Sequence, residues 1–390
     1  MIAPAGYGLG GAEPARVAEP ADASELAEEL RLCAQAREAV VPFGGGTLQG
    51  IGNAPTRYDV ALSTRRLDAV RAYDPRDLTI GVEAGITVAA LTRTLAEHGQ
   101  FVPLDVPDAE RASVGGVLAA GWLGPRRAAY GRPRDLLIGS TAALADGTLA
   151  SAGGMVVKNV TGYDVGKLYV GSLGTLGVLV RANFKALPKP AAHRLASAEL
   201  AEDARERTVA ALGALTVEPV AALAVDGFGG PLRIVVLFEG SEATVERATR
   251  DLRSALGRSG IAETTLLDGD QAERAFARVL AGYTEVVADR TITYREPGLP
   301  ASAWERARRM RALGAEVIAD LRTGDVIARF ARQHARTVLP RATILAGAAA
   351  LRADLDAWGE PPATLPTMRA LKERFDPSAI LAPGRFVGGI

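Results

Sequence analysis

The chain has 390 residues, of which 48% are hydrophobic and 23% charged, a composition typical of a globular protein with a large core. Its 45 basic and 45 acidic residues give a net charge of zero, which argues against binding to nucleic acid or to an anionic membrane surface. The length favours two domains, with three as the alternative.

Cysteine and histidine usage excludes several kinds of site. Cys33 is the only cysteine, so this chain alone can form neither an intrachain disulfide nor an iron–sulfur cluster. Its surroundings are predicted to be helical, which favours a buried structural thiol over a nucleophile. The three histidines (His98, His193 and His334) lack metal-ligand spacing, so no protein-built metal site is expected.

No targeting or membrane segment is apparent in the sequence. The first residues contain neither a basic region nor an apolar run, and no stretch is apolar for the length of a membrane span. We therefore expect a cytoplasmic protein, with any membrane association arising through its partners.

The N-terminal segment is interpreted as a tail. Residues 1–19 are rich in Gly, Pro and Ala, and we expect them to be disordered. They contain a GxGxxG pattern at Gly6, Gly8 and Gly11. No strand precedes it, so a dinucleotide fingerprint is disfavoured there.

The next elements follow an order that differs from a Rossmann unit. A helix is predicted over 22–37, with apolar positions on one face, then a strand over 39–42 and a glycine loop over 44–47. A Rossmann unit runs strand, glycine loop, helix. The reversal separates this chain from nicotinamide-binding folds.

Short strands and helices then alternate up to residue 188. Strands are predicted over 59–63 and 78–85, and a helix over 86–99 with Thr87 as N-cap and Gly99 as its stop. A hairpin over 135–151 has Asp146-Gly147 as its turn. A short helix, a glycine turn and a strand follow over 167–188, so this region is predicted to be α+β.

The sequence pattern changes after Pro188 and Pro190, which mark a domain boundary, because strands and helices now alternate without glycine loops. A strand over 232–240 and helices over 241–260 and 269–281 suit a smaller α+β unit with an antiparallel sheet. A helix and a proline-punctuated turn over 368–386 indicate an arm that packs back onto another domain. The predicted division of the chain is 1–19, 20–190, 191–365 and 366–390.

Three glycine-dense loops are candidate ligand sites. Successive N–H groups in Gly44-Gly45-Gly46-Thr47 can form an anion-binding nest, although a tight turn is the alternative. Ser113-Val114-Gly115-Gly116 is a second loop. Alternate glycines over 171–177 permit close passage of a flat group, with a β-bulge as the alternative. Taken together, the loops favour a large dinucleotide, and FAD is the leading candidate.

Candidate catalytic side chains are fewer. Arg126 and Arg127, on a Gly-Pro turn, can hold a phosphate or a substrate carboxylate through paired hydrogen bonds, with a solvated loop or a protein contact as the alternative. Tyr163 beside Asp164 is a candidate proton donor, with a structural turn as the alternative. Further candidate polar side chains are Lys158, Asn159 and His334.

Four motifs carry a resemblance to a known family: FGGGT (43–47), SVGGVLAAGWLGPRR (113–127), GGMVVKNVTGYDVGKLYVGSLGTLGVL (153–179) and RFDPSAILAPGR (374–385). They resemble the FAD-linked oxidases with a vanillyl-alcohol-oxidase (PCMH-type) flavin domain, and most of all the E-type FAD-binding subunit of glycolate oxidase. The resemblance covers about residues 20–190 and the last 25. It implies an α+β fold: a PCMH-type FAD-binding domain of two α+β subdomains, a smaller α+β cap with an antiparallel sheet, and a C-terminal return arm.

The resemblance also implies how the cofactor is held. Loop 41–47 is expected to bind the FAD pyrophosphate, and 113–116 with 121–124 to line the flavin and the ribityl chain. Loop 171–178 is expected to contact the adenosine side and the ring edge, with the arm beside the flavin. The expected cofactor-binding residues are Pro42, Gly44, Gly45, Gly46, Thr47, Ser113, Gly115, Gly116, Gly121, Gly124, Gly171, Ser172, Gly174, Thr175, Gly177, Val178, Pro383 and Gly384.

The sequence departs from the family pattern at several positions. No histidine lies near the first glycine loop, so FAD is expected to be bound non-covalently. Leu173 stands where catalytic relatives usually carry a glutamate, and Ala382 where they usually carry an asparagine. The metal-binding histidine motif of the related D-type subunit is also missing.

These features predict the FAD-binding subunit of a glycolate or D-lactate (2-hydroxy acid) oxidase or dehydrogenase. Hydride would pass from the substrate to the flavin, and electrons would then pass to a separate iron–sulfur subunit beside a catalytic flavin subunit. In that scheme Arg126 or Arg127 would clamp the substrate carboxylate and Tyr163 would assist proton transfer. The alternatives are a non-catalytic assembly subunit of the same complex and a stand-alone flavin reductase of the same fold.

Overall fold

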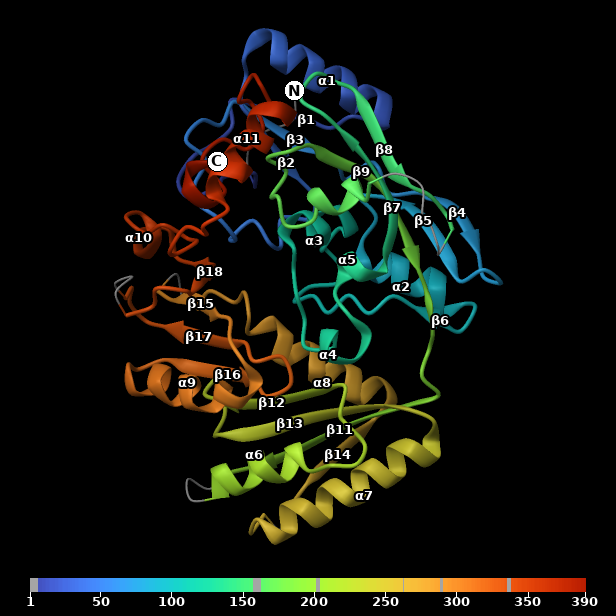
Figure 1. Ribbon diagram of the computed structural model, residues 1–390, viewed down its shortest axis with the longest axis vertical. Helices are drawn as coiled ribbons and strands as arrows, with labels where there is room; N and C mark the ends of the chain where they lie inside the picture. The colour runs from blue at the N-terminus through green and yellow to red at the C-terminus, as the bar shows by residue number, and fades with distance from the viewer. Residues whose placement is uncertain (1–5, 157–162, 201–203, 262, 288–289, 335–337) are drawn as a thin grey trace.

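The computed structural model describes residues 6–156, 163–200, 204–261, 263–287, 290–334 and 338–390. Figure 1 shows two parts stacked along the long axis. The first part comprises residues 6–188 together with the C-terminal residues 365–390, and the second part comprises residues 192–352. None of the helices in these described ranges is long and apolar enough to cross a membrane.

The first part begins with a small parallel sheet in the order β1-β3-β2, formed by β1 (Arg16–Ala18), β2 (Val40–Phe43) and β3 (Val60–Ser63). The residues before β1 are anchored to it. Tyr7 is buried, its ring meets Phe43 edge-on at 4.8 Å, and its carbonyl accepts a 2.8 Å hydrogen bond from the Tyr58 hydroxyl. The predicted disorder of residues 1–19 is therefore wrong for the described residues 6–19, because buried side chains within the Gly- and Pro-rich segment fix it to the sheet.

Helix α1 (Ala23–Ala36) packs against this sheet and confirms the helix predicted over 22–37. The Asp22 side chain caps it by accepting the N–H groups of Ser24 and Glu25 at 2.8 and 2.9 Å. Its buried face includes Cys33, which is fully buried, so the prediction of a buried thiol is also confirmed.

The first part also contains a five-stranded antiparallel sheet in the order β4-β5-β9-β7-β8 and a two-stranded antiparallel sheet, β10-β6. Thr87 caps the helix that follows β5, and the predicted hairpin turns at Gly147 with φ +85°. Both features confirm the sequence predictions. The elements are β4 (Val70–Asp74), β5 (Thr79–Glu83), α2 (Val88–Ala96), β6 (Gln100–Phe101), α3 (Val114–Ala120), α4 (Arg127–Tyr130), α5 (Pro133–Leu136), β7 (Leu137–Ala143), β8 (Leu149–Gly153), η1 (Val165–Leu168), β9 (Val178–Lys185) and β10 (Leu187–Pro188).

The second part is built on one eight-stranded antiparallel sheet, in the order β14-β11-β13-β12-β16-β17-β15-β18. The sheet and the elements of the first part give the α+β class that the sequence predicts. The elements are β11 (Ala192–Glu199), α6 (Arg205–Gly213), β12 (Ala221–Asp226), β13 (Arg233–Gly240), α7 (Glu242–Arg258), β14 (Thr265–Asp268), α8 (Gly269–Ala281), β15 (Ile292–Glu296), α9 (Pro300–Ala312), β16 (Glu316–Asp320), β17 (Val326–Phe330), β18 (Thr343–Gly347) and α10 (Ala349–Arg352).

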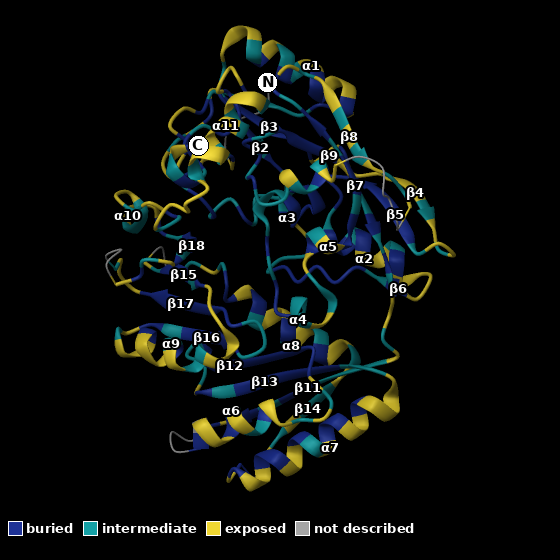
Figure 2. Cartoon of the chain, in the orientation of Figure 1, coloured by how far each residue is buried: buried dark blue, intermediate teal, exposed yellow. Residues whose placement is uncertain are grey.

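Strand alternation gives this sheet two buried faces. Along β13, Ile234 and Val236 pack with α7, whereas Val235 and Leu237 belong to a core shared with the first part. Helix α8 contributes Phe276 to that shared core, and Figure 1 places α8 between the sheet and the first part. The burial pattern in Figure 2 agrees, because β12, β13, β16 and β17 are mostly dark blue while the outer sides of α7 and α9 are exposed.

The C-terminal segment returns to the first sheet. Helix α11 (Leu365–Phe375) leads to a turn in which Leu381 forms a parallel bridge with Val40 of β2, and the chain ends with η3 (Val387–Gly389). The Val40 N–H donates to the Ile380 carbonyl at 2.8 Å, and the Ala382 N–H donates to the Val40 carbonyl at 2.8 Å. The segment therefore extends the edge of a sheet made by the first residues of the chain.

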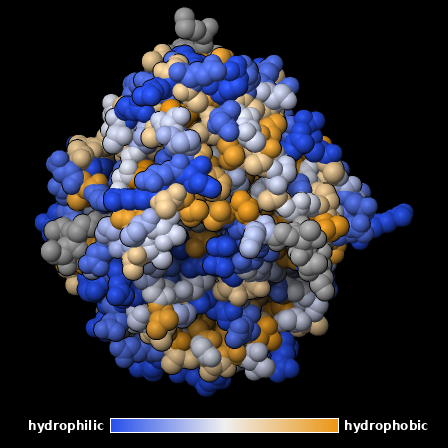
Figure 3. Space-filling model, turned by 45° about the horizontal axis from the view of Figure 1, so that its top comes forward, coloured by the Kyte–Doolittle hydropathy of each residue, from blue (hydrophilic) through white to orange (hydrophobic). Residues whose placement is uncertain are grey.

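The outer surface mixes polar and apolar residues. Figure 3 shows hydrophilic residues around most of the periphery and a group of hydrophobic residues near the middle of this face.

Candidate functional site

A cavity in the first part is lined by the three glycine loops predicted to bind a ligand. It lies where the loop after β2, the start of α3 and the loop before β9 come together. The lining residues are Pro42, Phe43, Gly44, Gly45, Gly46, Thr47, Leu48, Gln49, Thr64, Ser113, Gly115, Gly116, Ala119, Ala120, Leu173, Gly174, Gly177, Val178, Leu179 and Arg385.

The loop after β2 presents unpaired backbone donors. Within the described chain, the N–H groups of Gly44, Gly45, Gly46 and Thr47 donate to no hydrogen-bond acceptor. Four successive N–H groups without partners form the kind of nest that binds phosphate oxygens. Gly46 has φ +78°, a left-handed conformation that glycine adopts without strain.

Close packing also requires glycine at two positions of this loop. A Cβ on Gly45 would overlap the backbone carbonyl of Arg111, and one on Gly44 would overlap the hydroxyl of Ser113. The close backbone approach that the sequence predicted toward a ligand is thus found toward other residues of the chain, Arg111 and Ser113. The loop therefore packs closely against Arg111 and Ser113, at the start of α3.

The other two loops are joined to each other through α3. Ser113 caps α3 by accepting the Gly116 N–H at 3.2 Å. At the opposite end of α3, the N–H groups of Gly171 and Leu173 donate to the carbonyls of Leu118 and Ala119 at 2.9 and 2.8 Å. The loop before β9 is thereby fixed over the helix, and Leu173 and Gly174 reach the cavity wall.

The two departures from the family pattern share an unusual backbone. Leu173 has φ +51° and Ala382 has φ +44°. Left-handed backbone is unfavourable for residues other than glycine, asparagine and aspartate, and each such residue costs on the order of 1–2 kcal/mol. The surrounding hydrogen bonds therefore hold both residues in a conformation that their side chains do not favour.

The structure brings together most, but not all, of the predicted cofactor-binding residues. Those that line the cavity are Pro42, Gly44, Gly45, Gly46, Thr47, Ser113, Gly115, Gly116, Gly174, Gly177 and Val178. Those outside its lining are Gly121, Gly124, Gly171, Ser172, Thr175, Pro383 and Gly384.

The residues outside the lining have packing roles that explain their types. Gly121 and Gly171 lie backbone to backbone, Gly124 lies against Asp105, and Gly384 lies against Thr56. The hydroxyls of Ser172 and Thr175 bond carbonyls within their own loop, and the Pro383 carbonyl accepts the Thr56 N–H at 2.9 Å. These residues shape the loops around the cavity.

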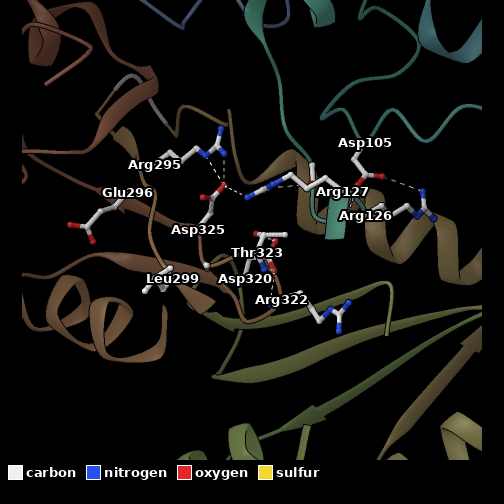
Figure 4. A network of polar contacts seen from close by, with 12 residues as sticks. Asp105, Arg126, Arg127, Arg295, Glu296, Leu299, Asp320, Arg322, Thr323 and Asp325 are labelled. Carbon is white, nitrogen blue, oxygen red and sulfur yellow. Dashed lines mark hydrogen bonds and ion pairs between the residues drawn. The ribbon is translucent and has the colours of Figure 1, made fainter. Parts of the chain in front are cut away.

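Arg126 lies where the two parts of the protein meet, and its side chain is 12% exposed (Figure 4). Its guanidinium forms an ion pair with Asp105 of the first part at 3.3 Å, which Figure 4 shows. It also forms ion pairs with Glu239 and Glu273 of the second part at 2.8 and 2.6 Å. Glu239 also accepts a 2.5 Å hydrogen bond from the hydroxyl of Tyr130. Burial raises the pKa of Asp105 to about 6, although the charge of Arg126 opposes that rise.

Arg127 lies beside it and is paired in the same way. Its Nη2 contacts Asp325 at 2.8 Å, and Asp325 also pairs with Arg295 at 2.5 Å. Figure 4 shows both guanidinium groups directed at the one carboxylate. Arg126 and Arg127 therefore contact protein carboxylates across the boundary between the two parts, which is the protein-contact alternative that the sequence left open.

The remaining candidate catalytic residues lie apart from the cavity. The Tyr163 side chain is 94% exposed, and Asp164 pairs with Lys167. His334 packs against Phe330 at 4.2 Å in the second part, where burial lowers its pKa. Lys158 and Asn159 lie outside the described residues.

Sequence reasoning missed several residues at the cavity. Gln49, Thr64 and Arg385 line it, and Arg385 is the only charged residue among the described residues of the lining. A further ion pair ties the arm to the glycine loops: the Lys372 ammonium contacts Asp376 at 2.6 Å and donates to the carbonyl of Thr175 at 2.9 Å. The sequence offered one indication, because Arg385 directly follows the Pro-Gly pair of the C-terminal motif.

The lining fits an FAD molecule in the hydrogen-bond donors that it offers. The unpaired N–H groups of 44–47 suit a diphosphate, and the glycines at 115, 116, 174 and 177 add no side chain to the lining at their positions. None of the described lining residues is a histidine or an acid, so the lining offers no general base. The donors of this cavity therefore suit the binding of a cofactor.

Comparison with known proteins agrees with this geometry. A family model for the FAD binding domain matches residues 14–153. Glycolate oxidase subunit GlcD of Bacillus subtilis is 33% identical over 177 residues, which are 45% of this chain and 38% of that protein. Glycolate oxidase subunit GlcE of Escherichia coli is 33% identical over 168 residues, 43% of this chain and 47% of that protein. Each match spans less than half of the relative's length.

The whole fold also has a counterpart among solved structures. An alkyldihydroxyacetonephosphate synthase superposes with a TM-score of 0.68 over 94% of this chain and 75% of that protein, at 16% identity. The similarity concerns the fold, and it extends through both parts of the molecule. Residues 14–153 therefore match the FAD binding domain family, in agreement with the resemblance of the glycine loops to a PCMH-type flavin domain.

Proposed function

We propose that this chain is an FAD-binding subunit of an oxidase or dehydrogenase that acts on the CH–OH group of glycolate or another small 2-hydroxy acid. The observation that carries the proposal is the nest of unpaired N–H groups at 44–47, within a domain whose relatives include GlcD and GlcE. FAD, when bound, supplies the acceptor for a substrate hydride, and the glycine loops hold and orient it.

The proposal includes partner subunits. A single cysteine cannot ligate an iron–sulfur cluster, so electrons would leave through a separate iron–sulfur protein. A second flavin subunit would carry the catalytic groups that the cavity lining does not offer. The names of GlcD and GlcE as subunits of one oxidase support an assembly of this kind.

The substrate-binding roles of Arg126, Arg127 and Tyr163 stay predictions. A carboxylate clamp at Arg126 or Arg127 would require the substrate to compete with Asp105, Glu239, Glu273 or Asp325. Unchanged substrate affinity of the assembled complex after R126A and R127A substitutions would rule out the clamp.

A second candidate function is a flavin-containing assembly or electron-relay subunit that does not itself oxidise substrate. The lining without acid or imidazole, and the pairing of both arginines with protein carboxylates, favour this alternative. It predicts a protein that binds FAD and is required for activity of the complex, but is not reduced by glycolate.

One absorbance experiment separates these functions. The purified chain, loaded with FAD, is recorded in the near-ultraviolet and visible before and after anaerobic addition of glycolate. Bleached flavin bands support substrate oxidation by this chain alone. Bands that persist support the assembly subunit, and bleaching by NADPH instead supports a stand-alone flavin reductase. Failure to bind FAD contradicts the proposal as a whole.

A further inference from the structure

Arg385 is a buried cation without an anionic partner. The residue is 2% exposed, and within the described chain no carboxylate pairs with its guanidinium. Its Nη2 donates to the backbone carbonyls of Gln49 and Ile51 at 3.2 and 2.8 Å. Isolated buried charges are strongly unfavourable, so proteins pair them or place them where a ligand supplies the opposite charge.

Another buried arginine shows the usual arrangement. Arg329 is 5% exposed and pairs with Glu285 and Glu316 at 2.7 and 2.6 Å. The same is true of Arg126, which has three carboxylates around it. Among the described residues no acid lies at Arg385, which therefore differs from Arg329 and Arg126.

A second cation increases the imbalance. Arg352 donates to the Gly52 carbonyl at 2.6 Å, and no carboxylate of the described chain pairs with it. Burial and the charge of Arg352 lower the pKa of Arg385 to about 10, and the Tyr58 hydroxyl opposes that shift. Two positive charges thus act on each other beside the loop that follows the nest.

The guanidinium of Arg385 retains free donors next to the cavity. Neither its Nε nor its Nη1 has a hydrogen-bond acceptor among the described residues. Arg385 lines the same cavity as Gly44–Thr47, whose N–H groups are also unpaired. Free N–H donors and a positive charge therefore border one space.

We propose that Arg385, supported by Arg352, is the anion-compensating residue of this cavity and binds an anionic group of the bound flavin cofactor. The anion is either the diphosphate or the flavin ring carrying negative charge. The proposal rests on FAD binding and is independent of whether this chain oxidises a substrate. It assigns to the arm a direct binding role that none of the glycine loops can supply, because backbone N–H groups carry no net charge.

Flavin titrations of the purified full chain test this assignment. Dissociation constants for FAD and for riboflavin, which lacks phosphate, are measured by flavin fluorescence for wild type, R385M, R385K and R374M. The R374M control changes an exposed arginine of the same arm. We expect R385M to weaken FAD binding by about 10- to 100-fold, the usual effect of removing a charge-assisted hydrogen bond. R385K should retain more affinity than R385M, and R374M should match wild type.

The two ligands identify the anion. Weaker binding of FAD with unchanged riboflavin assigns Arg385 to the diphosphate, and equal weakening of both assigns it to the ring. Unchanged FAD affinity in R385M, or equal losses in R385K and R385M, overturns the proposal. If R385M does not fold, R385K provides the test. One ammonium cannot bind both the carbonyls of Gln49 and Ile51 and the cofactor, so wild-type FAD affinity in R385K then overturns the proposal. Wild type that binds neither flavin contradicts flavin binding itself.

Discussion

Replacing Arg126 with methionine removes the cation on which three carboxylates converge. Methionine retains an apolar side chain against Phe276, over whose ring the guanidinium lies at 5.0 Å. Two of the carboxylates, Asp105 and Glu239, have side chains only 2% and 3% exposed. Removing one partner of a buried ion pair costs about 3–5 kcal/mol, and we expect R126M to lower the free energy of unfolding by that amount.

The loss should depend on pH. Burial raises the folded-state pKa of Asp105 to about 6, above the value near 3.9 of an unfolded aspartate. The folded state therefore binds the proton more tightly, and the Asp105 contribution to stability falls as pH rises from about 4 to about 6. Without Arg126 the pKa of Asp105 rises further, so the cost of R126M should be largest at about pH 8 and shrink toward about pH 5.

Urea unfolding at both pH values measures this difference, with R132M as the matched control. Arg132 pairs with Asp135 on the surface, where the two side chains are 50% and 42% exposed. We expect R132M to change the free energy of unfolding by less than about 1 kcal/mol. A loss for R126M as small as that of R132M, or one that grows as pH falls, would refute the reasoning.

Three further predictions follow from packing and burial. G45A should abolish FAD binding or folding, because its Cβ would overlap the Arg111 carbonyl. The control G257A, in open space on α7, should stabilise the protein by about 0.5–1 kcal/mol. Thermal unfolding of both variants with and without FAD measures the two effects. K372M leaves a fully buried carboxylate unpaired and should cost about 3–5 kcal/mol in urea unfolding, and a loss below about 1 kcal/mol would contradict this. Burial raises the pKa of Cys33 to about 12, so thiol reagents at about pH 8 should label it only after unfolding, and prompt labelling of the native protein would count against the structure.

Local patterns predicted the elements around the cavity well. Asp22 and Thr87 start helices where the sequence places them, and Gly147 turns the predicted hairpin. These features depend on residues close in sequence, such as a capping side chain and the N–H groups two or three positions later. The glycine loops were recognisable for the same reason, since a run of glycines has few uses besides turns and close approaches.

Features that depend on distant residues escaped the sequence. The guanidinium of Arg126 meets Glu239 and Glu273, more than 100 positions away, and no local pattern distinguishes that arrangement from a substrate clamp. The N-terminal segment was predicted to be disordered because it is rich in Gly, Pro and Ala, yet Tyr7, Leu9 and Val17 are buried in one cluster with Phe43. The sequence also does not reveal that, among the described residues, no acid pairs with the buried Arg385.

The bridge between Val40 and Leu381 makes the cofactor domain discontinuous in the gene product. During synthesis the first sheet and the nest loop emerge early, but the strand that extends the sheet, and the arginine that lines the cavity, are made only after the whole second part. Contacts this distant in sequence form late in folding. A nascent or truncated chain that ends before residue 380 would expose the β2 edge and hold an incomplete cavity, so cofactor loading should follow completion of the polypeptide.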